Sequence, residues 1–274
     1  MNGPGAGARI EPATLEDLAD RLWQAEVRRA PIAPLSGERP DLSADDAYRV
    51  QDHNVQRRVG AGRRVLGRKV GLTSRQVQEH LGILEPTYGA LLDDMFVDED
   101  DEIPHEALIQ PRIEAEIAFR LGRDLTGPGV TTTAALAAID GVLAALEVND
   151  SRIADWRLGL ADTVADNASS SRVVLGSRVV AVAGLDLRLL GMLFHRNGVP
   201  IDSGAGAAVL GHPARCVAWL ANTLGVRGSG LRAGDVVLSG ALHRMVPVRP
   251  GDTVRAEFAH LGSVTAQFSR GGAR

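Results

Sequence analysis

The stretch Arg112-Ile113-Glu114-Ala115-Glu116-Ile117-Ala118-Phe119 decides how this 274-residue chain is interpreted. It alternates as a β-strand does, where successive side chains point to opposite faces of a sheet. Its regularly spaced apolar residues share one face. Glu114 and Glu116 share the other, roughly 7 Å apart along the strand. The stretch therefore predicts a strand that covers a core with one face and presents two carboxylates on the other.

Two interpretations of these carboxylates stay open on the pattern alone. Glu114 and Glu116 could lie on a solvated face, which is common for an amphipathic strand. They could instead bind a hard divalent cation, which prefers carboxylate oxygens and relieves their mutual repulsion. Glu147 favours the second interpretation, because it follows an apolar run and would need a partner if buried. The Asn149-Asp150 pair just beyond it is equally typical of a strand end that emerges into solvent.

The surrounding segments indicate an α+β fold. Helical spacing and capping signals predict helices over residues 14–27, 43–59, 74–81 and 213–224. Alternating or apolar runs predict strands over residues 65–70, 113–121, 172–182 and 189–196. Residues 141–148 could be a buried strand or part of a helix, and Asn197-Gly198 predicts a hairpin turn. Because helices come first and strands dominate later, we expect a helical region at 1–63 and a β-rich domain carrying the site at 64–274.

Composition excludes several classes of protein. The 30 basic and 34 acidic residues are well mixed and give a net charge of −4, and aromatic residues make up only 4%. This balance argues against partners such as nucleic acid or an anionic membrane. No apolar stretch is long enough to span a bilayer, and the N-terminus lacks the plan of a signal peptide. With Cys216 as the one cysteine, we expect a cytoplasmic protein without disulfides.

Lys69 stands in Gly67-Arg68-Lys69-Val70-Gly71, where flanking glycines let the backbone approach a ligand closely. Such a lysine could bind a substrate carboxylate or move a proton, although an exposed surface lysine is the commoner situation. Gly204-Ala205-Gly206 lacks the arrangement of a dinucleotide-binding loop. The chain also lacks a Walker lysine motif, a Gly-x-Ser-x-Gly elbow and Cys/His zinc spacing.

Several motifs together resemble one known family. The chain is similar to the 2-oxopent-4-enoate (2-hydroxypentadienoate) hydratases and 4-oxalocrotonate decarboxylases of aromatic meta-cleavage pathways, within the fumarylacetoacetate hydrolase superfamily. The resemblance spans residues ~13–269. It rests on Lys69-Val70-Gly71-Leu72-Thr73-Ser74, Pro111-Arg112-Ile113-Glu114-Ala115-Glu116-Ile117, Glu147-Val148-Asn149-Asp150-Ser151-Arg152-Ile153, Val164-Ala165-Asp166-Asn167-Ala168-Ser169-Ser170, Gly204 to Gly211 and Leu261-Gly262-Ser263-Val264.

The resemblance implies a helical N-terminal part followed by a mixed β-roll or sandwich that holds the active site. It implies Mg²⁺ or Mn²⁺ on Glu114, Glu116 and Glu147, and a catalytic role for Lys69. It also implies a homo-oligomer, with association between a pathway hydratase and decarboxylase as a further option. It also implies that the loop 166–170 and Ser239-Gly240 line the substrate site. Residues implied to contact the substrate are Gly71, Thr87, Asn167, Ser169 and Ser239.

The resemblance implies a lyase that adds water to 2-hydroxypenta-2,4-dienoate, giving 4-hydroxy-2-oxopentanoate. One departure keeps an alternative open. Hydratases of this group usually carry Pro-Asp-Phe-Gly where this chain has Pro86-Thr87-Tyr88-Gly89. Thr87 cannot act as a carboxylate base, and the related decarboxylases also tend to lack that acid. The chain could therefore release CO₂ from 4-oxalocrotonate with the same metal site. A silent partner subunit and a hydrolase that cleaves C–C bonds fit less well.

Overall fold

The computed structural model describes residues 10–74, 78–79 and 85–271. Within these residues the N-terminal part is helical, as expected. Its helices are α1 (Pro12–Arg28), α2 (Leu35–Glu38) and α3 (Ala44–Gly60). Helix α1 begins two residues earlier than predicted because proline is tolerated in a first helical turn. The helix predicted over residues 74–81 lies mostly outside the described residues.

One large sheet contains the predicted strand that carries Glu114 and Glu116. Its order is β2-β1-β10-β5-β6-β7-β3, and β11 pairs with β5. The pairs β1–β10 and β3–β7 are parallel, and the other pairs are antiparallel. The open choice at 141–148 is resolved in favour of a strand. The strands are β1 (Val65–Gly71), β2 (Thr87–Leu92), β3 (Phe96–Val97), β5 (Arg112–Leu121), β6 (Ile139–Asn149), β7 (Ser170–Leu175), β10 (Val236–Ala241) and β11 (Val246–Pro247).

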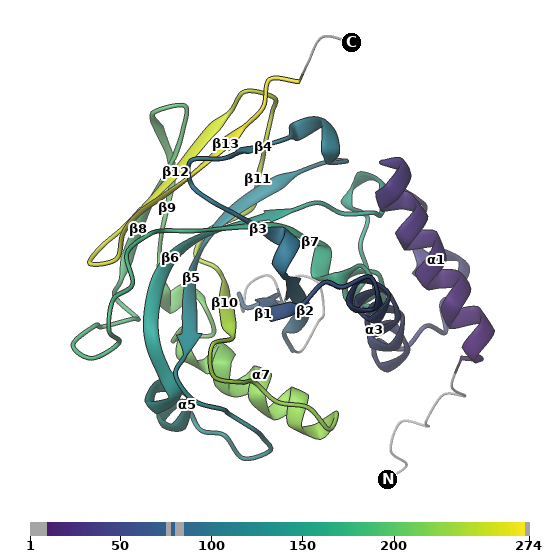
Figure 1. Ribbon diagram of the computed structural model, residues 1–274, viewed down its shortest axis with the longest axis horizontal. Coiled ribbons are helices and arrows are strands. Elements are labelled where there is room, and N and C mark those ends of the chain that lie inside the picture. The colour runs from purple at the N-terminus through teal and green to yellow at the C-terminus, as the bar shows by residue number, and fades with distance from the viewer. Residues whose placement is uncertain (1–9, 75–77, 80–84, 272–274) are drawn as a thin grey trace.

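A second sheet has the order β4-β13-β12-β8-β9. The predicted hairpin is confirmed, because Asn197 and Gly198 connect β8 to β9 with positive φ angles of 54° and 79°. Figure 1 shows β12 and β13 beside the outer curve of β6. The strands are β4 (Glu102–Ile103), β8 (Gly191–Arg196), β9 (Val199–Ala205), β12 (Thr253–Phe258) and β13 (Gly262–Phe268).

The large sheet curls strongly, and Figure 1 shows the predicted helix α7 (Ala214–Val226) on the inner side of the curve, next to β10. Shorter helices lie between the strands along the chain. They are α5 (Thr132–Ala138) and α6 (Leu160–Ala165), with 3₁₀ turns η1 (Asp93–Met95), η2 (His105–Ala107), η3 (Ala154–Trp156), η4 (Asn167–Ser169) and η5 (Gly206–Ala208). The architecture is α+β, and the curled sheet with its companion sheet matches the expected β-roll.

The apolar core is continuous between the two predicted regions. Leu18 of α1 and Tyr48 of α3 belong to the same buried cluster as Ile117 of β5 and Val254 of β12. The division between 1–63 and 64–274 therefore stays a prediction. No helix in the described part of the chain is long and apolar enough to cross a bilayer.

Candidate active site

The register between β5 and β6 brings the three predicted carboxylates together. Glu114 lies directly opposite Glu147, and Glu116 follows two residues later on the same face of β5. Oxygen atoms of the three side chains lie within 4.8 Å of one another. Glu114 is 8% exposed, and Glu116 and Glu147 are fully buried. The interpretation of a solvated carboxylate face is therefore wrong.

Lys69 reaches the same cluster from β1. Its Nζ donates to Glu147 Oε2 at 2.9 Å and to Asn149 Oδ1 at 3.2 Å. The side chain is buried, so the surface-lysine interpretation is wrong too. Burial alone would lower the pKa of Lys69, but the charges of Glu147, Glu114 and Glu116 outweigh it and raise the pKa above its usual value. Lys69 is therefore an ammonium group at neutral pH.

Each carboxylate is held by a donor that belongs to a different element. Asn149 Nδ2 donates to Glu114 Oε1 at 3.1 Å and lies 3.5 Å from Glu147 Oε2. Ser170 Oγ donates to Glu147 Oε1 at 2.7 Å. The backbone N–H of Gly240 donates to Glu116 Oε2 at 2.7 Å, at a point where the β10–β5 register shifts. Such donors fix which carboxylate oxygens remain for a ligand.

When ionised, the three carboxylates would carry more negative charge than the described residues balance. Burial raises the pKa of Glu114 to about 7, and it raises the pKa of Glu116 well above its usual range. Among the described residues Glu116 Oε1 has no hydrogen-bond partner. A divalent ion would balance the charge of three ionised carboxylates against one ammonium and would so favour their ionised forms. An all-oxygen ligand set suits a hard cation, so these residues fit a metal site.

A pocket of about 380 Å³ opens beside the cluster. Trp156, Leu158 and Met245 make part of its wall apolar. Arg112 lies at the pocket, with its guanidinium 4.5 Å from the centre of the Trp156 ring. The residues predicted for the site that line this pocket are Lys69, Gly71, Thr87, Glu114 and Ser169.

Two residues that were predicted to contact the substrate, Asn167 and Ser239, do not line this pocket. Asn167 uses its amide to pair with the backbone of Ala90, donating at 2.9 Å and accepting at 2.7 Å. Ser239 Oγ accepts from Ile117 N–H at 3.2 Å, so it replaces a backbone acceptor where β10 bulges. Neither Asn167 nor Ser239 is among the residues that line the pocket. Their geometry suits a role in placing η4 and β10.

The segment η4 presents Ser169 to the pocket in an unusual backbone conformation. Asn167, Ala168 and Ser169 have positive φ angles of 53°, 49° and 57°. Residues other than glycine avoid this left-handed region, at a cost of roughly 1–2 kcal/mol each. Asp166 holds the turn, because it accepts from Ser169 Oγ at 3.0 Å and pairs with buried Arg152. Strain of this kind often marks functional sites.

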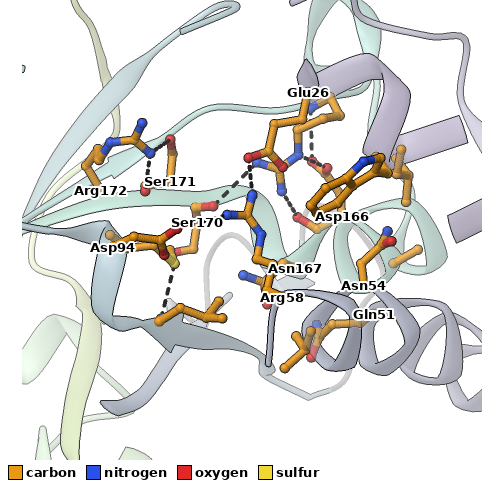
Figure 2. A pocket seen from close by; sticks show the side chains of 17 residues that line it. Glu26, Gln51, Asn54, Arg58, Asp94, Asp166, Asn167, Ser170, Ser171 and Arg172 are labelled. Carbon is orange, nitrogen blue, oxygen red and sulfur yellow. Dashed lines mark hydrogen bonds and ion pairs between the residues drawn. The ribbon is translucent and has the colours of Figure 1, made fainter. Parts of the chain in front are cut away.

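Figure 2 shows a second, smaller pocket. Its volume is about 120 Å³, and Asn167 and Ser170 are part of its wall. Figure 2 shows Arg58 of α3 bonded to Glu26 of α1 across this pocket. Its charged groups largely satisfy one another, and it contains none of the three clustered carboxylates. The larger pocket is therefore the candidate active site.

Sequence reasoning missed several residues of this site. Asn149 was associated with a solvated strand end, yet it is buried between Lys69 and the carboxylates. Ser170 and Gly240 were implied to line the substrate site, but their role as carboxylate donors was missed. His243 lines the pocket, but its Nε2 accepts the N–H of Ala115 at 2.9 Å, so its ring supports β5. The signal that could have found Asn149 is its two-residue spacing from Glu147 along one strand face.

One known protein family matches most of this chain. A family described as "Fumarylacetoacetate (FAA) hydrolase C-terminal" matches residues 57–269. The chain is 51% identical to a 2-keto-4-pentenoate hydratase of Paraburkholderia xenovorans (strain LB400) and to 2-keto-4-pentenoate hydratase 3 of Pseudomonas putida. Each alignment covers 94% of this chain and 96% of the relative.

A solved structure is also similar over nearly the whole chain. The 4-oxalocrotonate decarboxylase from Pseudomonas putida G7, complexed with magnesium and adipate, superposes with a TM-score of 0.91 at 38% identity. The match covers 94% of this chain and 98% of the decarboxylase. With both sequence and fold in agreement, the chain belongs to the fumarylacetoacetate hydrolase family, in the group of the 2-keto-4-pentenoate hydratases and 4-oxalocrotonate decarboxylase.

Proposed function

We propose that the chain is a divalent-metal-dependent lyase that adds water to 2-hydroxypenta-2,4-dienoate and forms 4-hydroxy-2-oxopentanoate. The observation that carries the proposal is the buried cluster of three carboxylates, with Lys69 in contact, beside a partly apolar pocket that Glu114 and Lys69 line. The 51% identity to two named hydratases supports the choice of reaction.

Glu114, Glu116 and Glu147 would hold Mg²⁺ or Mn²⁺. When bound, the ion would act as a Lewis acid toward the C1 carboxylate and 2-oxygen of the substrate. Lys69, an ammonium in contact with Glu147, can donate a proton to C5 of the dienol while the 2-hydroxyl loses its own proton, which restores the ammonium; the product is a conjugated 2-oxo acid. Ser169 and the backbone at Gly71 would contact the carbon chain, because both lie at the pocket wall.

The decarboxylase alternative keeps one specific support. The chain has Thr87 at the position where hydratases of this group usually carry an aspartate, and the decarboxylase fold superposes closely. Both reactions need a negative charge stabilised at the 2-oxygen, so a metal ion held by the carboxylate cluster would serve either. The two reactions differ only in the groups around the far end of the substrate.

Product analysis distinguishes the two reactions. The protein with Mg²⁺ is incubated separately with 2-hydroxypenta-2,4-dienoate and with 2-hydroxymuconate, and products are identified by NMR and CO₂ trapping. We expect 4-hydroxy-2-oxopentanoate from the first substrate. Release of CO₂ from the second, without hydration of the first, would replace the hydratase assignment with the decarboxylase.

We also propose that the enzyme is cytoplasmic and homo-oligomeric. Its one cysteine, Cys216, is buried and free, which suits a reducing compartment. Light scattering of the purified chain gives its mass, and a monomer at micromolar concentration would contradict the oligomer.

A further inference from the structure

Gly71 and Thr87 lie opposite each other at the ends of strands β1 and β2. Directly paired residues of an antiparallel pair share a face of the sheet, as do residues two apart along a strand. Thr87 and Gly71 therefore lie on the same face as Lys69. The residue opposite Lys69 is Gly89, so no side chain from β2 covers the ammonium group there.

The Thr87 hydroxyl is a buried polar group without a partner. The residue is 1% exposed, and Thr87 Oγ1 has no hydrogen-bond partner among residues 10–74, 78–79 and 85–271. Leaving a buried hydroxyl unpaired costs free energy, so such groups in native proteins call for an explanation. Thr87 also lines the pocket, so a molecule bound there can supply the missing partner.

Gly71 leaves room between the hydroxyl and the ammonium. A Cβ atom added at Gly71 would lie 3.1 Å from Thr87 Oγ1 and 3.7 Å from Lys69 Nζ. Any side chain at this position would therefore enter the space between the two groups. We call this space, bounded by Gly71, Thr87 and Lys69, the water niche. Thr87 and Lys69 make it polar on two sides, and all three bounding residues belong to the wall of the substrate pocket, which suits a single water molecule.

We propose that the water niche holds the water molecule that adds to C4 of the substrate. The inference rests on the proposed hydratase function. After a proton reaches C5, the oxygen of this water bonds to C4. The electron pair of the C3=C4 bond then moves toward C2, giving an enolate. One hydrogen of the water is finally taken up at C3, and the other remains in the 4-hydroxyl group, so the reaction adds one H₂O in balance.

Thr87→Val and Gly71→Ala test the water niche separately. Valine keeps the branched shape and the strand preference of threonine but removes the hydroxyl, and alanine places a methyl group inside the niche. Two rates are measured with Mg²⁺ present. The first is hydration of 2-hydroxypenta-2,4-dienoate. The second is exchange of the C3 hydrogens of 2-oxopentanoate with D₂O, which requires enolisation but no added water.

We expect hydration to fall about 100-fold in both variants, as for a misplaced reactant. In Thr87→Val the fall of C3 exchange should be much smaller than the fall of hydration. Thr87→Ser should recover most hydration. The melting temperature of Thr87→Val should stay close to that of the parent, because valine keeps the buried shape and removes the hydroxyl together with its need for a partner. Gly191→Ala is the matched control for Gly71→Ala, since a Cβ at Gly191 meets no atom within 4 Å.

Two results would overturn the proposal that the water niche holds the added water. One is an equal fall of hydration and exchange in Thr87→Val, and the other is hydration at the parental rate in both variants. A failure of the proposed function is distinguishable from these. In that case the parent itself would not hydrate the dienoate, and the niche would be refuted with the function.

Discussion

Asn149 is the residue at which the charged groups of the site meet. Because Lys69 can only donate, its contact with Oδ1 orients the amide and turns Nδ2 toward Glu114 and Glu147. Asn149→Ala should weaken Mn²⁺ binding roughly 10- to 100-fold, the usual effect of losing a hydrogen bond to a metal ligand. Calorimetric titration of the metal-free protein measures this. Unchanged affinity, with an unchanged melting temperature, would show that Asn149 does not orient the ligands.

We expect Lys69 to contribute both charge balance and chemistry. Lys69→Met keeps the length of the side chain but leaves Glu147 without its ion-pair partner in the interior. Breaking a buried pair in this way typically costs about 3–5 kcal/mol. We expect the metal-free variant to lose stability, Mg²⁺ to restore much of it, and hydration to stay absent. Chemical unfolding with and without Mg²⁺, together with the assay, tests this; a fully active variant would remove Lys69 from the mechanism.

At the scale of elements, the bulge in β10 aims a backbone donor at the site. Gly240 has a φ of +97°, and a Cβ there would lie 2.3 Å from Thr73 Oγ1. Gly240→Ala should therefore lower the free energy of unfolding by about 1–3 kcal/mol and weaken metal binding through Glu116. Urea unfolding beside Gly191→Ala as the unstrained control checks the first part. Equal stability of the two variants would contradict it.

The elements predicted correctly from the sequence are those with a clear period. Strand β5 alternates, α7 has helical spacing, and the β8–β9 hairpin has Asn197-Gly198 at its turn. Strand β2 was missed because all of Thr87–Leu92 is buried, so no alternation exists to detect. The strand expected over 172–182 ends at Leu175. There Gly176 donates to Ala144 O and lies close to Ser263 of the second sheet.

The candidate site was only partly predictable for a related reason. The carboxylates and Lys69 are unusual within their own segments, so a sequence can indicate them. Ser170 and Gly240 act through contacts with Glu147 and Glu116 that span 23 and 124 residues. Such contacts depend on strand register and on the bulge in β10, and neither is written in a local pattern.

At the scale of the whole molecule, the buried carboxylates should make stability depend on pH and metal. Burial raises the pKa of Glu114 from an ordinary value near 4.5 to about 7. The folded metal-free protein therefore keeps a proton that the unfolded chain releases between these values. The resulting stabilisation is complete below pH 4.5 and is lost as pH rises through about 7. We expect metal-free protein to be less stable at pH 8 than at pH 5.5.

Urea unfolding of the parent and of Glu114→Gln at both pH values isolates this effect. The fall in the parent should exceed that in the variant by roughly 1–3 kcal/mol. Mg²⁺ should stabilise the parent more at pH 8 than at pH 5.5, because the ion binds the ionised carboxylates. Identical pH profiles for parent and variant would show that Glu114 is ionised throughout this range.

The central proposal is that the carboxylate cluster holds the ion that hydration requires. The direct measurement is turnover of 2-hydroxypenta-2,4-dienoate by protein stripped with EDTA and verified to be metal-free, followed by titration with Mg²⁺ and Mn²⁺. We predict no turnover without metal, recovery with either ion, and much higher metal requirements for Glu114→Gln and Glu147→Gln. Full hydration by the metal-free protein, or parental metal titrations for both variants, would contradict the account.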